Sequence, residues 1–128
     1  MRLPFSLLAL ATLPFAPADS ARADSHLSGP VAEIVTFRVA SGTTKEQFIA
    51  AARQTEPFVA AAPGFVSRTL TQGEDGVWTD YILWRDMTSA KQMAAAFMDE
   101  PSVIPFMQAI DPETVVMRHE VVMWQMQQ

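Results

Sequence analysis

The sequence predicts a small α+β domain whose elements follow the order β-α-β-β-α-β. Four segments, 31–40, 65–72, 77–84 and 114–124, are rich in β-branched and aromatic residues, and the first alternates in period two as a strand does. Two longer stretches, about 44–62 and 88–100, repeat apolar residues at helical spacing. Only the polar loop 73–76 separates the second and third strands, so these strands must be antiparallel neighbours.

Turn and capping signals set the expected limits of the first helix. Thr43 and Glu46 have the spacing of a capping box, and either Thr43 or Thr44 can cap the helix. Pro57 lies inside the helical pattern, so we expect a kink or a break there. Gly64 can take the positive φ that reverses the chain after the helix.

The second helix and the segment after it are bounded by similar signals. Thr88 or Ser89 is the expected N-cap, and Pro101 closes the helix. The apolar segment 103–110 is expected to form one or two further helical turns, and Pro112 lies in the turn before the last strand.

Two βαβ halves joined by a hairpin predict a ferredoxin-like fold, a four-stranded antiparallel sheet with both helices on one face. The other face is then bare. Its expected residues are Ile34, Thr36 and Arg38 on the first strand, with Val116, Arg118 and Val122, or the opposite parity, on the last. A half-apolar face is costly to leave in water, so we expect a homodimer that buries about 800 Å² per partner through this open sheet face.

The first 23 residues have the layout of a secretory signal peptide. Arg2 gives a positive start, segment 3–18 is mostly apolar, and Ala21 and Ala23 are small residues at the −3 and −1 positions of a cleavage site after Ala23. The apolar stretch is too short and too interrupted by proline to span a bilayer as a stable helix. We therefore expect a periplasmic or secreted protein with no membrane anchor after cleavage, a flexible leader at 24–30 and a folded domain at 31–128.

Composition excludes several classes of function. Cleavage would remove Arg2, Arg22 and Asp19 from the 9 basic and 14 acidic residues, which leaves 7 and 13 and a net charge of −6. An acidic domain of this kind lacks the basic surface that binds nucleic acid or an anionic membrane. The sequence has no cysteine, which excludes disulfides, thiol catalysis and thiolate metal sites.

Segment 34–120 resembles the antibiotic-biosynthesis-monooxygenase-like (ABM-like) group of the dimeric α+β barrel proteins. The resemblance rests on the opening strand IVTFRV, on APGFVSRTL after the first helix, on GEDGVWTDYILWRDMTSAKQM from the hairpin into the second helix, and on FMDEPSVIPFM after it. It implies a barrel built from two sheets and a pocket between the sheet and helices of each protomer. Some members oxidise aromatic or quinol-like substrates without metal or flavin, some bind or degrade haem, and many have no known reaction.

The sequence departs from the oxygenase-type members of this group at two points. Segment 94–101 has no histidine, although those members commonly carry one in or just after the second helix, and the chain contains no asparagine. The resemblance in fold survives these losses, but a particular reaction does not follow from it. If the protein is an enzyme, the resemblance implies oxidation by O₂ without a cofactor.

Three polar residues are candidates for catalysis. His119 is the one histidine of the predicted domain and would act as a general base or an axial haem ligand; the alternative is a structural histidine paired with a neighbour. Arg68 and Asp80 are at similar distances from the hairpin loop, so they form either a substrate-orienting pair or a structural ion pair. A single imidazole with scattered carboxylates does not supply the ligands of a zinc site, and we expect no metal ion.

Aromatic residues are the candidates for substrate binding. Trp78 and Trp84 share one face of their strand, and on the helix side they would bracket a pocket with Phe37, Phe48, Phe58 and Phe97. Aromatic walls suit a flat ligand, and a buried indole N–H needs a polar partner. The alternative is that these side chains are simply core.

Three functional hypotheses remain open. The first is an exported domain that binds a small apolar or aromatic molecule between sheet and helices, with or without cofactor-free monooxygenase activity. The second is a non-catalytic dimeric module that acts in stress protection or in a larger assembly. The third is haem binding through His119.

Overall fold

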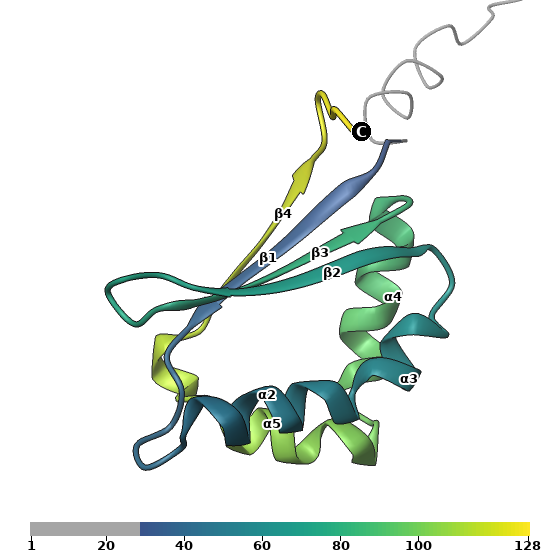
Figure 1. The fold of residues 1–128 in the computed structure, drawn as a ribbon. Helices are drawn as coiled ribbons and strands as arrows, with labels where there is room; N and C mark the ends of the chain where they lie inside the picture. The colour runs from purple at the N-terminus through teal and green to yellow at the C-terminus, as the bar shows by residue number, and fades with distance from the viewer. Residues whose placement is uncertain (1–28) are drawn as a thin grey trace, which may run out of the picture.

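The computed structural model describes residues 29–128, in which one antiparallel sheet carries all of its helices on one side (Figure 1). The strands, in the spatial order β2-β3-β1-β4, are β1 (Val31–Phe37), β2 (Phe65–Gln72), β3 (Trp78–Trp84) and β4 (Val116–Val121). The helices are α2 (Lys45–Gln54), α3 (Glu56–Ala60), α4 (Met87–Phe97) and α5 (Ile104–Gln108), and two 3₁₀ turns, η1 (Pro101–Val103) and η2 (Pro112–Thr114), flank α5. This arrangement confirms the predicted ferredoxin-like fold.

The predicted signal peptide and most of the predicted leader lie outside the described residues. Within residues 29–128, no helix has the length and apolar character needed to cross a membrane.

Helix α2 begins at a capping box, but the box is one residue further along than predicted. The Thr44 Oγ1 accepts a hydrogen bond from the backbone N–H of Gln47 at 3.2 Å, and the Gln47 Oε1 accepts one from the backbone N–H of Thr44 at 2.9 Å. The predicted pair of Thr43 and Glu46 was wrong. Both pairs have the same spacing, so the spacing alone did not decide between them.

The break predicted at Pro57 falls two residues earlier, at Thr55, which separates α2 from α3. Pro57 is the second residue of α3. In the first turn of a helix the backbone N–H has no intrahelical partner, so proline is tolerated there. The Thr55 Oγ1 donates to the carbonyl oxygen of Ala52 at 2.6 Å, and Thr55 is fully buried.

Helix α4 is capped by Asp86, and the prediction of Thr88 or Ser89 as the cap was wrong. The Asp86 Oδ1 accepts a hydrogen bond from the backbone N–H of Ser89 at 2.7 Å. This backbone hydrogen bond is the main reason that the pKa of Asp86 is lowered. The strands are also shorter than their sequence patterns: β1 stops at Phe37, and β4 ends at Val121, opposite the first residue of β1.

The chain turns tightly between α3 and β2, at Gly64. Gly64 has a φ of +81°, and a Cβ added there would lie 2.2 Å from the Ser89 Oγ at the start of α4. The turn therefore brings the backbone into direct contact with α4, and only glycine fits.

The register assigns each strand residue to one face of the sheet. Glu33 on β1 pairs with Ile82 on β3 and with His119 on β4, and Ile82 pairs with Arg68 on β2. Paired residues share a face, so this row points toward the helices together with the buried Trp84.

The opposite face carries Ile34, Thr36, Val116 and Arg118, as the strand pattern predicted. No helix of residues 29–128 covers it (Figure 1). Tyr81 and Val116 are 39% and 57% exposed there. Arg38, predicted on this face, lies just beyond β1, where its guanidinium donates to the carbonyl oxygen of Asp75 at 2.9 Å.

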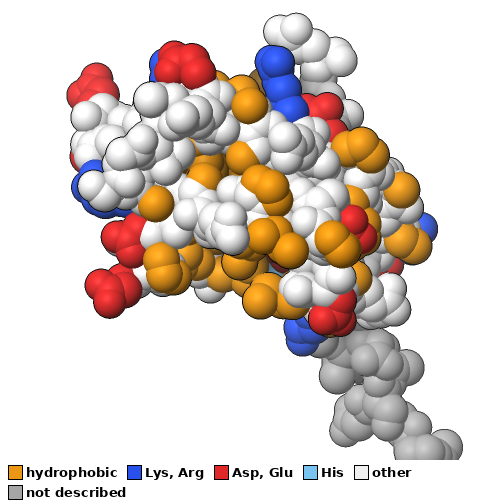
Figure 2. Space-filling model, turned by 90° about the horizontal axis from the view of Figure 1, so that it is seen from below, with side chains coloured by type: hydrophobic (Ala, Val, Ile, Leu, Met, Phe, Trp, Pro, Cys, Tyr) orange, Lys and Arg blue, Asp and Glu red, His pale blue; other side chains and the backbone are white. Residues whose placement is uncertain are grey.

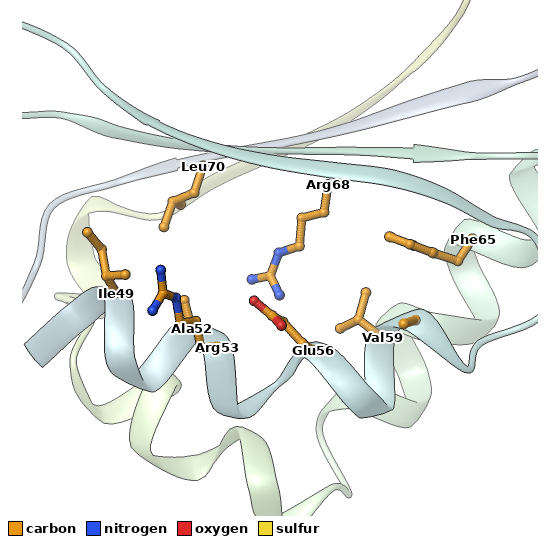
Figure 3. Close-up of a pocket in the computed structure, with 9 residues that line it drawn as sticks. Ile49, Ala52, Arg53, Glu56, Val59, Phe65, Arg68 and Leu70 are labelled. Carbon is orange, nitrogen blue, oxygen red and sulfur yellow. The ribbon is translucent and has the colours of Figure 1, made fainter. Parts of the chain in front are cut away.

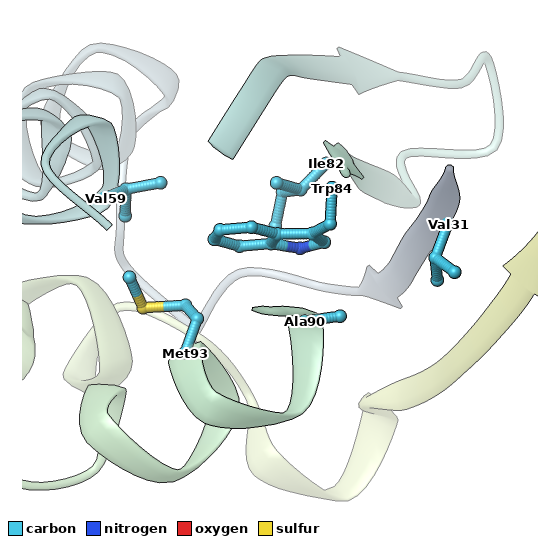
Figure 4. Close-up of a cluster of buried hydrophobic side chains, with 6 residues drawn as sticks. All are labelled: Val31, Val59, Ile82, Trp84, Ala90 and Met93. Atoms are coloured by element: carbon cyan, nitrogen blue, oxygen red, sulfur yellow. The ribbon is translucent and has the colours of Figure 1, made fainter. Parts of the chain in front are cut away.

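Two apolar clusters form the core between sheet and helices. One contains Val31, Val59, Ile82, Trp84, Ala90 and Met93 (Figure 4). The other contains Phe37, Phe48, Ala51, Trp78, Phe106 and Ile110. Residues of both clusters also line a cavity between the sheet and the helices.

Candidate functional site

A cavity of about 170 Å³ lies between the sheet and the helices; we call it the inner cavity. Its wall is mostly apolar and includes the aromatic side chains of Phe37, Trp84, Phe97 and Phe106. The charged side chains that line it come from three neighbouring strands of the sheet: Glu33 on β1, Asp80 on β3 and Arg68 on β2. An apolar pocket with a few converging polar groups is the usual form of a small-molecule site.

Arg68 and Asp80 form a two-pronged ion pair on the wall of this cavity. The Arg68 Nε donates to Asp80 Oδ1 at 2.9 Å and its second terminal nitrogen donates to Asp80 Oδ2 at 2.7 Å. The other terminal nitrogen donates to the Thr55 Oγ1 at 2.6 Å, and the guanidinium lies 5.2 Å from the ring centroid of Phe106. The two side chains are only 14% and 6% exposed, so the pair is held in one geometry away from bulk water.

The pair is diagonal because Arg68 is opposite Ile82 in the register, while Asp80 is opposite Leu70. The sequence distance from the hairpin loop left both a direct and a diagonal arrangement open. The structure shows the diagonal one, which aligns the planar guanidinium with both carboxylate oxygens.

Glu33 is the polar residue of this site that the sequence analysis did not single out. It is 4% exposed, on the central strand β1, and its Oε2 lies 2.7 Å from the Nε2 of His119. The sequence pattern did indicate that Glu33 is unusual. In the alternation along β1, it lies on the same face as the apolar residues Val31, Val35 and Phe37. A charged residue on the buried face of a strand is a candidate for function.

Burial raises the pKa of Glu33, and the negative charge of nearby Asp80 raises it further. The hydrogen bond and charge of His119 and the charge of Arg68 act in the opposite direction but do not outweigh burial. Glu33 is therefore a stronger base than an exposed glutamate.

His119 is 20% exposed at its side chain and contacts the inner cavity only through Glu33. Its Nε2, the nitrogen that faces into the protein, is bound to the carboxylate. This geometry corresponds to the paired histidine that the sequence analysis gave as an alternative.

The predicted aromatic residues separate into two groups. Phe37, Trp84 and Phe97 line the inner cavity. The other three lie elsewhere: Phe48 and Trp78 pack against each other in the second core cluster, and Phe58 packs against Phe97 between α3 and α4.

Neither buried tryptophan has the polar partner that was expected. The Nε1 atoms of Trp78 and Trp84 are buried without a hydrogen bond to any described residue. Figure 4 shows the Trp84 indole above Ala90 and Met93, among apolar side chains.

The mouth of the inner cavity is rimmed by methionine. Met98, Met107 and Met117 line the cavity and are 71%, 42% and 50% exposed. Figure 2, which views the protein from below, shows hydrophobic side chains gathered across this helical side. Flexible thioethers allow such a rim to change shape.

A second, more open hollow of about 430 Å³ lies between β2 and the helices α2 and α3; we call it the outer groove (Figure 3). Arg53 and Glu56 line it from the helices, and Leu70 lines it from β2. Arg68 and Val59 line both hollows, so they form the wall between them.

No family model and no curated protein matches the sequence. Solved structures do match. SnoaB, a cofactor-independent oxygenase from Streptomyces nogalater, is 21% identical with a TM-score of 0.54 over 77% of this chain and 96% of its own. A putative antibiotic biosynthesis monooxygenase from Bordetella bronchiseptica is 19% identical with a TM-score of 0.62 over 75% of this chain and 99% of its own.

This chain has an ABM-like fold. A dimeric ferredoxin-like protein of unknown function from Jannaschia sp. CCS1 has the same fold at 9% identity, with a TM-score of 0.57 over 73% of this chain and all of its own. At these identities the ABM-like fold is what the structures share. The function must be argued from the inner cavity.

Proposed function

We propose that this ABM-like domain binds a small apolar or aromatic molecule in the inner cavity between sheet and helices. The observation that carries the proposal is the combination, in one cavity, of an apolar wall with three converging polar side chains of the sheet. An apolar cavity of about 150 Å³ is enough to bind benzene, so a volume of about 170 Å³ fits a molecule with one aromatic ring.

The test is binding of fluorobenzene, followed by ¹⁹F NMR. We expect saturable binding at one site, and we expect Ala94→Leu, which fills the cavity from α4, to weaken it by about tenfold or more. Ala95→Leu is the matched control, because Ala95 is exposed on the same helix. Equal binding by both variants would place fluorobenzene outside the inner cavity and contradict the proposal.

A second candidate function is cofactor-independent monooxygenation of the bound molecule. Its support is the fold shared with SnoaB and the presence of a buried carboxylate with a raised pKa in the cavity. In the balanced reaction, benzene-1,4-diol and O₂ give hydroxy-1,4-benzoquinone and water. One oxygen atom enters the ring, the other leaves as water, and the diol supplies all four electrons.

Oxygen uptake with benzene-1,4-diol tests this activity against spontaneous oxidation. We expect uptake to exceed that of heat-denatured protein, and ¹⁸O₂ to label the added hydroxyl. Uptake equal to the denatured control, in a protein that binds fluorobenzene, would leave a binding domain without this reaction.

We also propose that the protein is a homodimer through its open sheet face. Tyr81 and Val116 are exposed there, and a symmetric partner would cover both copies of this face at once. We expect Tyr81→Lys with Val116→Lys to give a monomer in sedimentation velocity. Ile104→Lys changes an exposed apolar residue on the helical side and is expected to leave the dimer intact. A wild-type monomer at micromolar concentration would contradict this proposal.

Export is the remaining part of the proposed function. The signal-peptide pattern of residues 1–23 supports it. Mass spectrometry of the protein expressed with its full sequence is expected to show a chain that begins at Asp24 in the periplasm or medium. An uncleaved chain in the cytoplasm would contradict it.

A further inference from the structure

We propose that Glu33 recognises a ring hydroxyl of the ligand, so that the inner cavity selects single-ring phenols over aromatic hydrocarbons of the same size. This inference rests on the proposed function, and it adds a specificity-determining residue and a ligand class. It follows from which polar atoms of the cavity already have a hydrogen-bond partner within the protein and which do not.

Arg68 on β2 and Asp80 on β3 are hydrogen-bonded to each other. Both carboxylate oxygens of Asp80 accept from Arg68, and the remaining nitrogen of Arg68 donates to Thr55. Displacing either would break a buried ion pair, which is costly. A ligand therefore gains little by competing for these atoms.

One carboxylate oxygen of Glu33 has no such hydrogen-bond partner within residues 29–128. Its Oε2 is bound to His119, whereas its Oε1 accepts no hydrogen bond from any described residue. Glu33 also lines the cavity, so this oxygen is available to a molecule inside it. A carboxylate oxygen accepts hydrogen bonds and, when ionised, cannot donate one.

The charges around Glu33 decide which ligand group suits it. The cavity is lined by two carboxylates, Glu33 and Asp80, and by a single guanidinium, and the helices contribute no titratable side chain to its wall. An anionic ligand would meet an excess of negative charge. A neutral hydroxyl donor offers Glu33 a charge-assisted hydrogen bond in a water-poor space, where such bonds are strongest.

His119 acts here as a positioning residue. It holds Oε2 from β4 and so leaves Oε1 as the carboxylate oxygen without a partner among the described residues. Its hydrogen bond and charge also lower the pKa of Glu33, against the larger effect of burial.

The experiment compares fluorobenzene with 4-fluorophenol, which differs from it by one hydroxyl group, by ¹⁹F NMR titration of the full-length protein. Above the raised pKa of Glu33, we expect 4-fluorophenol to bind about tenfold more tightly, as for a hydrogen bond to a charged group. This advantage should shrink as the pH falls toward the ordinary glutamate value of 4.5, while fluorobenzene affinity stays constant.

Three variants locate the effect. Glu33→Gln should reduce the advantage of the hydroxyl and abolish its pH dependence. Glu56→Gln, the same change in the outer groove, should leave both unchanged. His119→Phe removes the group that lowers the pKa of Glu33, so the pH at which the advantage disappears should move upward.

The outcomes separate this inference from the proposed function. Equal affinity of the two ligands in the wild-type protein overturns the inference and leaves the apolar site in place. A hydroxyl advantage that is lost in Glu56→Gln, or that does not vary with pH, also overturns it. Failure of both ligands to bind overturns the proposed function. If Glu33→Gln does not fold, the pH dependence of the wild-type protein still decides.

Discussion

The Nε2 of His119 lies 2.7 Å from the Oε2 of Glu33, and this contact joins the edge strand β4 to the central strand β1 on the helix-covered face of the sheet. Glu33 is buried there and His119 is partly exposed, so the pair connects the interior of the protein with solvent.

Glu33 should make the protein less stable as the pH rises. Its pKa in the folded state is raised above 4.5, so between pH 4.5 and the raised value the folded state binds more protons than the unfolded chain. The free energy of unfolding therefore falls with increasing pH across this window. Urea unfolding at several pH values should show this slope in the wild-type protein relative to Glu33→Gln. A difference between the two proteins that is constant with pH would contradict the prediction.

The ion pair of Arg68 and Asp80 predicts a strongly non-additive pair of substitutions. Arg68→Met alone leaves a buried carboxylate without its partner and should cost about 3–5 kcal/mol, and Asp80→Leu alone should cost a similar amount. The double variant should recover most of this loss, because an apolar pair replaces both charges. The measurement is a double-mutant cycle by denaturant unfolding.

The pair of Arg85 and Asp86 is the control for this cycle, because it lies outside the open sheet face. The Arg85 Nε is 3.3 Å from the Asp86 Oδ2, and the side chains are 68% and 35% exposed. Screening by water should keep the coupling of this pair well below that of Arg68 and Asp80. Additive single and double variants at Arg68 and Asp80 would show that the buried pair is not coupled.

The fold could be predicted from the sequence because its main signals are local. The period-two pattern of residues 31–37 correctly predicted β1 and the face of the sheet that no described helix covers. The two-glycine loop at 73–76 correctly predicted the antiparallel pairing of β2 and β3. The place of Glu33 in the wall of the inner cavity was harder to predict. The alternation along β1 showed on which face Glu33 lies. Its partner His119, however, is 86 residues away and comes next to it only through the register of β1 and β4.

Details decided by three-dimensional packing could not be predicted. Thr43 and Thr44 each have a suitable residue three positions later, and only the final path of the chain selects Thr44. The expectation that Trp84 has a polar partner followed a sound general rule, but the apolar cluster around it offers none. The inner cavity itself depends on where α5 lies, which no sequence pattern specified.

The contact between Gly64 and Ser89 predicts a large effect of one methyl group. Gly64→Ala would combine a strained φ of +81° with a Cβ 2.2 Å from the Ser89 Oγ, and should cost about 2–5 kcal/mol. Gly42→Ala has a similar φ of +83° but meets no atom within 4 Å, so it should cost only about 1–2 kcal/mol. Thermal unfolding of both variants measures the difference, and equal losses would show that the contact with Ser89 is unimportant.

The position of the α2 capping box predicts that two adjacent threonines differ in their contribution to stability. Thr44→Ala removes the acceptor of the Gln47 N–H and should destabilise the protein by about 1 kcal/mol. Thr43→Ala should change the free energy of unfolding by less than about 0.5 kcal/mol. A larger loss for Thr43→Ala than for Thr44→Ala would place the start of the helix one residue earlier.

The most direct test of the account is a crystal structure of the protein with 4-bromophenol, in which anomalous scattering locates the bromine. The account predicts one strong peak in the inner cavity, beside Phe97 and Phe106, with the phenol oxygen within hydrogen-bonding distance of the Glu33 Oε1. A peak confined to the outer groove beside Arg53 and Glu56, or an inner cavity without bromine at saturating ligand, would contradict it.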